Sequence, residues 1–273
     1  MKIGLHLSIS SGFEALRRQA ERLHLRAVQI FVKNPRSWAP KRWKEKHIQE
    51  FSSLARDFSV FAHISYLPNP ARALDEERHL LALMHEIELC VQIGIGYVVL
   101  HPGARKEKER GLLNLRGVVR EMIQRYEIRI LIENTAGAGS ELGCRLGELR
   151  EMLEGVEPSC RVGFCIDTSH LFQAGYDIRK PEVWDEVKSI LGRENIGLIH
   201  LNDSKTPLAS RIDRHWHIGK GQIGIETFSY ILHDPDLKEL SFIMEPPEMG
   251  KRDEENVRVV NALLSPLELH LLP

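Results

Sequence analysis

The feature of this sequence that most restricts its fold is a regular alternation of two kinds of segment. Short runs rich in Val, Ile, Leu and Phe alternate with longer stretches whose apolar residues recur every three or four positions. Strands separated by amphipathic helices form right-handed βαβ units and therefore a parallel sheet. The predicted strands span residues 2–8, 25–32, 60–65, 96–101, 129–134, 162–168, 196–203 and 241–246.

Eight such strands in a chain of 273 residues predict an α/β fold, with a single (β/α)8 (TIM) barrel over residues 1–273. The clearest helices are expected at 12–23, 74–93 and 254–264, and Gly94 is expected to end the second of these. A doubly wound open sheet is the alternative architecture. It is disfavoured because no G-x-G-x-x-G sequence follows the first predicted strand.

The composition is that of an ordinary globular protein. The chain has 37 Lys and Arg against 38 Asp and Glu, and 42% of its residues are hydrophobic, which excludes disordered and collagen-like classes. No run approaches the ~18 consecutive apolar residues of a membrane span, and the N-terminal sequence lacks the apolar segment of a signal peptide. The four cysteines form no C-x-x-C pair. We therefore expect a cytoplasmic protein with reduced thiols and no membrane partner.

Six consecutive predicted strands carry or end in a residue that can bind a metal ion or move a proton. In a barrel of this type the C-terminal ends of the strands form the rim on which active sites are built. Carboxylates that converge there repel one another unless cations neutralise them. The six residues are His63, His101, Glu133, Asp167, His200 and Glu245.

Three further candidate ligands follow the sixth and seventh strands. His170 lies three residues after Asp167, and a D-x-H sequence places Asp213 and His215 on the same side of an extended loop. Imidazole and carboxylate ligands without a thiolate suit zinc, manganese or iron. The nine candidates are enough for two or three ions, and ions a few ångströms apart suit phosphoryl displacement.

A series of short motifs runs in order along essentially the whole chain. They are FVKNPRSW at 31–38, HISYL at 63–67, HPG at 101–103, IENTAG at 132–137, CIDTSH at 165–170, AGYD at 174–177, HLNDSK at 200–205, SRIDRH at 210–215 and GKGQIG at 219–224. Together these motifs resemble the endonuclease IV family of apurinic/apyrimidinic (AP) endonucleases. The combination is specific, whereas any one motif alone is not.

The resemblance implies a TIM barrel that holds three zinc ions, and Mn2+ could occupy one or more of the sites. Glu133 would bridge the first two ions. The remaining ligands would be His63 and His101 at the first ion, Asp167, His200 and Glu245 at the second, and His170, Asp213 and His215 at the third.

The activity implied by the resemblance is DNA repair on double-stranded DNA that contains abasic sites. The phosphodiester on the 5′ side of the abasic nucleotide would be hydrolysed, leaving a 3′-hydroxyl and a 5′-deoxyribose phosphate, and blocked 3′ ends would also be cleaned. Zinc supplies a nucleophile at neutral pH by lowering the pKa of water. Glu245 and Glu133 are the expected catalytic residues, with Glu245 orienting the attacking water and acting as its base.

DNA contacts are expected from two loops on the same rim. By resemblance, Arg36 and Tyr66 would enter the duplex at the lesion, with Leu67 beside them. An aromatic wedge next to a basic contact suits kinked, unstacked DNA. Phosphate contacts are expected from Lys33, Arg36, Lys41, Arg42, Arg105, Lys106 and Arg110. We expect a monomer, because one barrel can hold the whole site.

The alternative function is a divalent-metal sugar isomerase or epimerase on the same barrel. The Asp213 and His215 pair and the Arg36 and Tyr66 loops favour DNA, since an enzyme acting on a small sugar needs neither. One departure from the family pattern is Pro246-Pro247 after the last ligand, where Thr is usual. It removes a hydroxyl beside Glu245 and stiffens the backbone, with consequences for rate and substrate preference. His6 and His217 are candidates for contacts to the ligands or to phosphates.

Overall fold

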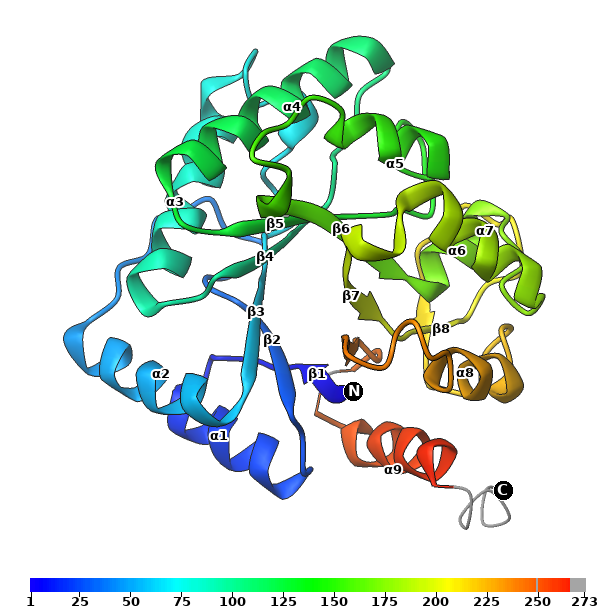
Figure 1. Cartoon of the computed structure of the whole chain (residues 1–273). Helices are drawn as coiled ribbons and strands as arrows, with labels where there is room; N and C mark the ends of the chain where they lie inside the picture. The colour runs from blue at the N-terminus through cyan, green and yellow to red at the C-terminus, as the bar shows by residue number, and fades with distance from the viewer. Residues whose placement is uncertain (249, 266–273) are drawn as a thin grey trace.

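The computed structural model describes residues 1–248 and 250–265. Eight parallel strands close into a barrel, and helices surround it (Figure 1). Neighbours around the barrel follow the chain, so each predicted strand pairs with the next and the eighth pairs with the first. The (β/α)8 prediction is confirmed. The strands are β1 (Lys2–His6), β2 (Ala27–Phe31), β3 (Ser59–His63), β4 (Tyr97–Leu100), β5 (Arg129–Glu133), β6 (Val162–Asp167), β7 (Ile196–His200) and β10 (Ser241–Met244).

The helices form the outer layer. Their bounds are α1 (Phe13–Arg22), α2 (Glu45–Asp57), α3 (Glu77–Ile93), α4 (Lys108–Arg125), α5 (Leu146–Leu153), α6 (Thr168–Ala174), α7 (Pro181–Leu191), α8 (Ile225–Leu232) and α9 (Asp253–Leu264). Short 3-10 turns occur at Pro70–Arg72, Ser159–Arg161 and Arg193–Asn195. No helix among the described residues is long and apolar enough to cross a membrane.

The predicted helix boundaries agree with the structure to within one residue, except at the start of α3. Gly94 ends α3 in the left-handed conformation, with φ of 85°, as expected. However, α3 begins at Glu77 and not at Leu74. The segment before it is a 3-10 turn, and the backbone N–H of Leu74 donates to the side chain of Asn114 on α4. This contact with a neighbouring helix has no local sequence signal.

A small hairpin was not predicted. The seventh predicted strand extended to residue 203, but β7 ends at His200, and Asp203–Ser204 forms a separate two-residue strand, β8. It pairs antiparallel with β9 (His215–Trp216). Two-residue strands carry too little periodicity to predict. The hairpin returns the chain to the rim, so that His215 lies above the barrel.

One layer of small and apolar side chains fills the barrel interior. The residue that β1 contributes to this layer is Gly4. A side chain does not fit there, because an added Cβ would lie 2.2 Å from the carbonyl oxygen of Ala27. The other strands contribute Ala27, Phe61, Val99, Leu131, Cys165, Leu198 and Ile243, all of them buried. Because side chains alternate along a strand, the residue two positions further on each strand also points inward.

Leu131→Ala tests this layer. The leucine is fully buried on β5, and truncating such a side chain costs about 3 kcal/mol through lost transfer energy and the cavity left behind. We expect the free energy of unfolding in urea, followed by circular dichroism, to fall by about that amount. Leu113→Ala on α4 is the control. That side chain is 58% exposed, and its loss should cost less than about 0.5 kcal/mol.

Candidate functional site

A ring of polar side chains lies directly above the apolar layer of the barrel. Each strand supplies one of them, two residues beyond its apolar interior residue, because side chains alternate along the strand. The six predicted ligands are therefore brought together by strand register alone. The ring consists of His6, Gln29, His63, His101, Glu133, Asp167, His200 and Glu245.

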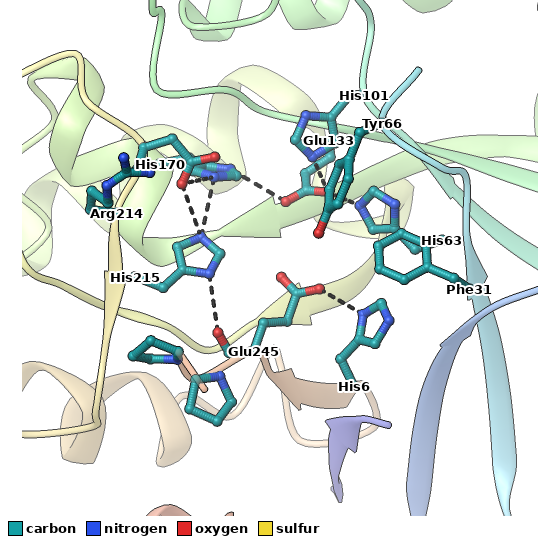
Figure 2. A pocket seen from close by; sticks show the side chains of 13 residues that line it. His6, Phe31, His63, Tyr66, His101, Glu133, His170, Arg214, His215 and Glu245 are labelled. Atoms are coloured by element: carbon teal, nitrogen blue, oxygen red, sulfur yellow. Dashed lines mark hydrogen bonds and ion pairs between the residues drawn. The ribbon is translucent and has the colours of Figure 1, made fainter. Parts of the chain in front are cut away.

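The carboxylate of Glu133 lies at the centre of the site. It is fully buried, and its Oε2 lies 3.1 Å from Nε2 of His63 and 3.1 Å from Nε2 of His101 (Figure 2). On its other side, Oε1 lies 3.0 Å from Nδ1 of His200 and 3.3 Å from Nδ1 of His170. Burial alone raises the pKa of Glu133, but the surrounding imidazoles outweigh this and hold the pKa well below its ordinary value. The carboxylate is therefore ionised at neutral pH.

Two groups of potential metal ligands share Glu133. In the first, His63, His101 and Glu133 each present a ligand atom within 4.8 Å of the others. In the second, Glu133 is joined by His200, Asp167 and Glu245 at the same mutual distance. Nδ1 of His200 lies 3.2 Å from Oε2 of Glu245 and 3.9 Å from Oδ2 of Asp167. These are the two groups predicted around the first two ions.

A third group lies beside the second. Nε2 of His170 and Nε2 of His215 are 3.3 Å apart, and Oδ1 of Asp213 lies 3.3 Å from the first and 3.5 Å from the second. Oδ2 of Asp167 also lies 3.5 Å from Nε2 of His215. His170 is oriented by α6, because Asp167 caps that helix and accepts its backbone N–H at 2.8 Å. His215 arrives on the β8–β9 hairpin.

The imidazole rings are held in the orientation typical of metal-binding histidines. In four of them one ring nitrogen faces a carbonyl or amide oxygen that can only accept a hydrogen bond, so in the neutral ring that nitrogen carries the proton and the other can offer a lone pair to a metal ion. The pairs are Nδ1 of His63 with Ile64 O at 2.7 Å, Nδ1 of His170 with Asn134 O at 2.9 Å, Nδ1 of His215 with Glu245 O at 3.3 Å, and Nε2 of His200 with Gln29 Oε1 at 2.9 Å.

This arrangement fits metal ions. Nδ1 of His200 lies 3.0 Å from Oε1 of Glu133 and 3.2 Å from Oε2 of Glu245, so a cation bound between these atoms would take the place of the ring proton. Lone pairs and anionic oxygens that face one another in a buried site require a cation. Nitrogen and oxygen donors of this kind are suited to zinc.

Three amide side chains that sequence reasoning missed hold the carboxylates. Gln29 donates to Oε1 of Glu245 at 2.8 Å, and Asn202 donates to Oδ2 of Asp167 at 2.6 Å. Asn202 also accepts the backbone N–H of Glu245 at 2.7 Å, and Asn134 accepts that of Asp167 at 2.7 Å. Two sequence features could have identified these residues. Gln29 is the one polar residue of the strand AVQIF, and Asn134 and Asn202 closely follow the candidate ligands Glu133 and His200.

The two further histidines behave differently. Nδ1 of His6 lies 3.1 Å from Oε1 of Glu245, so His6 is a partner of a candidate ligand. His217 instead contacts Asn256 on α9, with 3.1 Å between Nδ1 and Nδ2. Its expected contact with a ligand is not observed, because the loop after β9 directs this ring toward α9.

The site opens into a cavity of about 340 Å³ that is lined by Tyr66, whereas Arg36 and Leu67 line neighbouring hollows. Tyr66 lines this cavity and also borders two neighbouring hollows, and its side chain is 60% exposed. Its ring lies edge-on to Phe31, with 5.1 Å between centroids, and the guanidinium of Arg36 lies 5.9 Å from it. Leu67 is half-buried beside it. Partial burial of the phenol, together with the negative charge of Glu245, raises the pKa of Tyr66 to about 12, so the phenol is neutral.

Three of the basic side chains predicted to contact phosphates have partners within the chain. The side chain of Lys33 is buried and its ammonium donates to the carbonyl oxygen of Ser37 at 2.7 Å. Arg105 and Arg110 both form ion pairs with Asp75. The charge pattern showed basic residues near the rim, but only the packing decides which of them have an acidic or carbonyl partner.

Gln29→Leu tests the hydrogen bond that orients His200. Loss of a hydrogen-bond partner of a metal ligand typically lowers the metal affinity by about 10- to 100-fold. We expect the variant to release one divalent ion at a correspondingly lower concentration of a competing chelator, measured by metal analysis of the retained protein. Gln19→Leu is the control, because Gln19 on α1 donates to Asp253 far from the ring. Equal retention by Gln29→Leu and wild type would contradict the assignment.

Comparisons with known proteins agree with this geometry. The family model described as a xylose isomerase-like TIM barrel matches residues 17–264. A protein from Chloroflexus aggregans named "Probable endonuclease 4" is 36% identical, and the alignment covers 96% of this chain and 98% of the relative. A protein of the same name from Nitrosopumilus maritimus is 34% identical over 94% of this chain and 98% of its own length.

Solved structures show the same relationship. The crystal structure of endonuclease IV from Thermus thermophilus superposes with a TM-score of 0.86 at 34% identity, covering 97% of this chain and 99% of that one. A D-tagatose 3-epimerase-like protein reaches a TM-score of 0.75 at 21% identity over the whole of both chains, which shows a shared fold alone. The chain described here belongs to the endonuclease IV family of the xylose isomerase-like TIM barrels.

Proposed function

We propose that this protein is a zinc-dependent AP endonuclease that hydrolyses the phosphodiester 5′ to an abasic nucleotide in double-stranded DNA. The products are a 3′-hydroxyl and a 5′-deoxyribose phosphate, and the same site removes blocking groups from damaged 3′ ends. One observation carries this proposal. Three groups of potential metal ligands lie around a cavity that is lined by an exposed tyrosine, and the guanidinium of Arg36 lies 5.9 Å from the ring of that tyrosine.

The ligand groups in the structure would hold three ions. Zinc there would lower the pKa of water and neutralise the charge that develops on the phosphoryl group, and manganese could replace it at one or more sites. Glu133 would be shared by the first two ions. The other ligands would be His63 and His101, then Asp167, His200 and Glu245, then His170, Asp213 and His215.

Glu245 is placed to act on the attacking water. Its carboxylate lines the cavity, and His6 and Gln29 both contact its Oε1, at 3.1 and 2.8 Å. Burial raises the pKa of this group, but His200 and His6 outweigh the effect and hold it well below its ordinary value. The carboxylate is thus ionised and fixed in orientation, so it would orient a water molecule and accept its proton.

The rim residues would recognise the lesion. An abasic nucleotide leaves the stack at low cost because no base pair and little stacking are lost. Tyr66 presents a neutral aromatic face that could fill the gap, Leu67 would support it, and Arg36 would contact the backbone. Pro246 and Pro247 line the same cavity as Glu245, so they would limit what the cavity admits.

The alternative, a sugar isomerase or epimerase, explains less of the structure. A small-sugar enzyme would use the first two ligand groups, but it has no use for the His170, Asp213 and His215 group or for an exposed Tyr66. The barrel contains the complete set of ligands, so no second subunit is needed. We propose a monomer that acts in the cytoplasm.

Incision of a labelled duplex with one tetrahydrofuran abasic analogue tests the function. This analogue cannot undergo β-elimination, so cutting requires hydrolysis. We expect cutting that leaves a 3′-hydroxyl, that disappears after treatment with a zinc chelator, and that returns when zinc or manganese is restored. Absence of cutting by the metal-loaded protein would favour the isomerase, and ketose and aldose substrates would be tried next.

Glu245→Gln tests the role of the proposed base. Loss of general base catalysis lowers kcat by about 10²- to 10⁴-fold, whereas binding of the abasic duplex should change by less than about threefold. Single-turnover cleavage, equilibrium binding and metal content are measured together. Glu239→Gln is the control, because Glu239 is exposed in the segment before β10. An equal loss of binding and turnover would contradict a catalytic role.

A further inference from the structure

A buried carboxylate behind the rim contacts one of the two loops that carry the proposed lesion contacts. Glu86 on α3 is fully buried, although the other buried residues of that helix are apolar. Its Oε2 accepts the backbone N–H of Ser65 at 2.9 Å, and the Ser65 hydroxyl donates to its Oε1. Ser65 directly precedes Tyr66, so Glu86 fixes the backbone where the tyrosine leaves the barrel.

The same carboxylate is connected to the second loop through Lys33. Nζ of Lys33 lies 3.9 Å from Oε1 of Glu86 and donates to the carbonyl oxygen of Ser37 at 2.7 Å. Ser37 directly follows Arg36, so the lysine holds the loop on the C-terminal side of the arginine. The two loops also meet directly, because the N–H of Tyr66 donates to the carbonyl oxygen of Pro35 at 3.2 Å.

Stability alone does not account for this group. Removing a carboxylate and an ammonium from water costs several kcal/mol per ion, and well-packed apolar side chains often serve the fold equally well. Burial raises the pKa of Glu86, because the ionised form loses its hydration. The hydrogen bonds from Ser65 offset part of this increase. What an apolar residue could not do is bind a backbone N–H of one loop and the lysine of the other at the same time.

We propose that Glu86 is a positioning residue for lesion recognition, which sets the distance between Arg36 and Tyr66 by holding Ser65 and Lys33. The inference rests on the proposed function, because it concerns how the same site selects abasic DNA. Glu86 touches neither substrate nor metal ligands. Its effect is therefore on the binding of abasic duplex and not on the chemical step.

Glu86→Gln is the first test. The substitution keeps the shape but removes the charge that holds Lys33, so the ammonium is left without its partner and the Arg36 loop is released. We expect KM for the tetrahydrofuran duplex to rise about tenfold, while kcat, metal content and binding of intact duplex stay within about twofold. Glu148→Gln is the matched control. Glu148 is a buried glutamate on α5 whose Oε2 lies 3.1 Å from Nζ of Lys108, and its variant should leave KM unchanged.

A double-mutant cycle separates positioning from general weakening. In the Arg36→Ala/Tyr66→Ala background, Glu86→Gln should change KM by less than about twofold, because the residues it positions are gone. The same tenfold rise in both backgrounds would overturn the proposal, as would an unchanged KM in the otherwise wild-type chain or a fall in kcat or metal content. Wild-type protein that does not cut the duplex at all would refute the proposed function instead.

Two single substitutions keep the test decisive if Glu86→Gln does not fold. Ser65→Ala removes the hydroxyl contact and Lys33→Gln removes the ammonium, and each leaves the carboxylate in place. Each should raise KM by about threefold with kcat unchanged. If neither variant changes KM, Glu86 does not act through these contacts and the proposal fails.

Discussion

The buried, ionised carboxylate of Glu133 is the constraint on which the rest of the site depends. A charge with no exposure to solvent must be compensated within hydrogen-bonding distance, and four imidazoles surround this one. Protonated imidazoles compensate it when no metal is bound, and two of these rings, His63 and His200, hold their second nitrogen against an oxygen acceptor, which fixes their orientation. The site is thus built to receive positive charge between the rings and the carboxylates, which is the physical requirement of a metal centre.

The barrel supplies this centre through register. Each strand places one residue in the apolar interior layer and, two positions later, one polar residue above it. The close-packed apolar layer excludes water from the barrel interior and keeps the strands rigid. The polar residues are held rigidly as well, because they belong to the same strands. A site on strands is held more closely than one on loops. The third ligand group comes from α6 and a longer loop, and there the cap of α6 and the β8–β9 hairpin restrain the side chains.

Around the metal ligands, amide side chains and one buried ion pair set orientation. Gln29, Asn134 and Asn202 form hydrogen bonds to the candidate ligands, whereas Glu86 contacts the loops at the rim. The amides thus affect the arrangement of the candidate metal ligands, whereas Glu86 affects the arrangement of the residues proposed to recognise the lesion. The division follows from position, since the amides contact the ligands inside the barrel, whereas Glu86 contacts Ser65 and Lys33 of the rim loops.

The fold and the nine candidate ligands could be predicted from the sequence, because periodicity reports strands and helices and because polar residues at strand ends stand out against apolar runs. The same reasoning could not identify Gln29 and Asn202 as partners or show that Lys33 turns inward, since each contact joins residues far apart in the chain. Local sequence determined which residues could face the rim. Tertiary structure alone decided which of them meet, because the closure of the barrel and the packing of α3 against its loops set the distances between them.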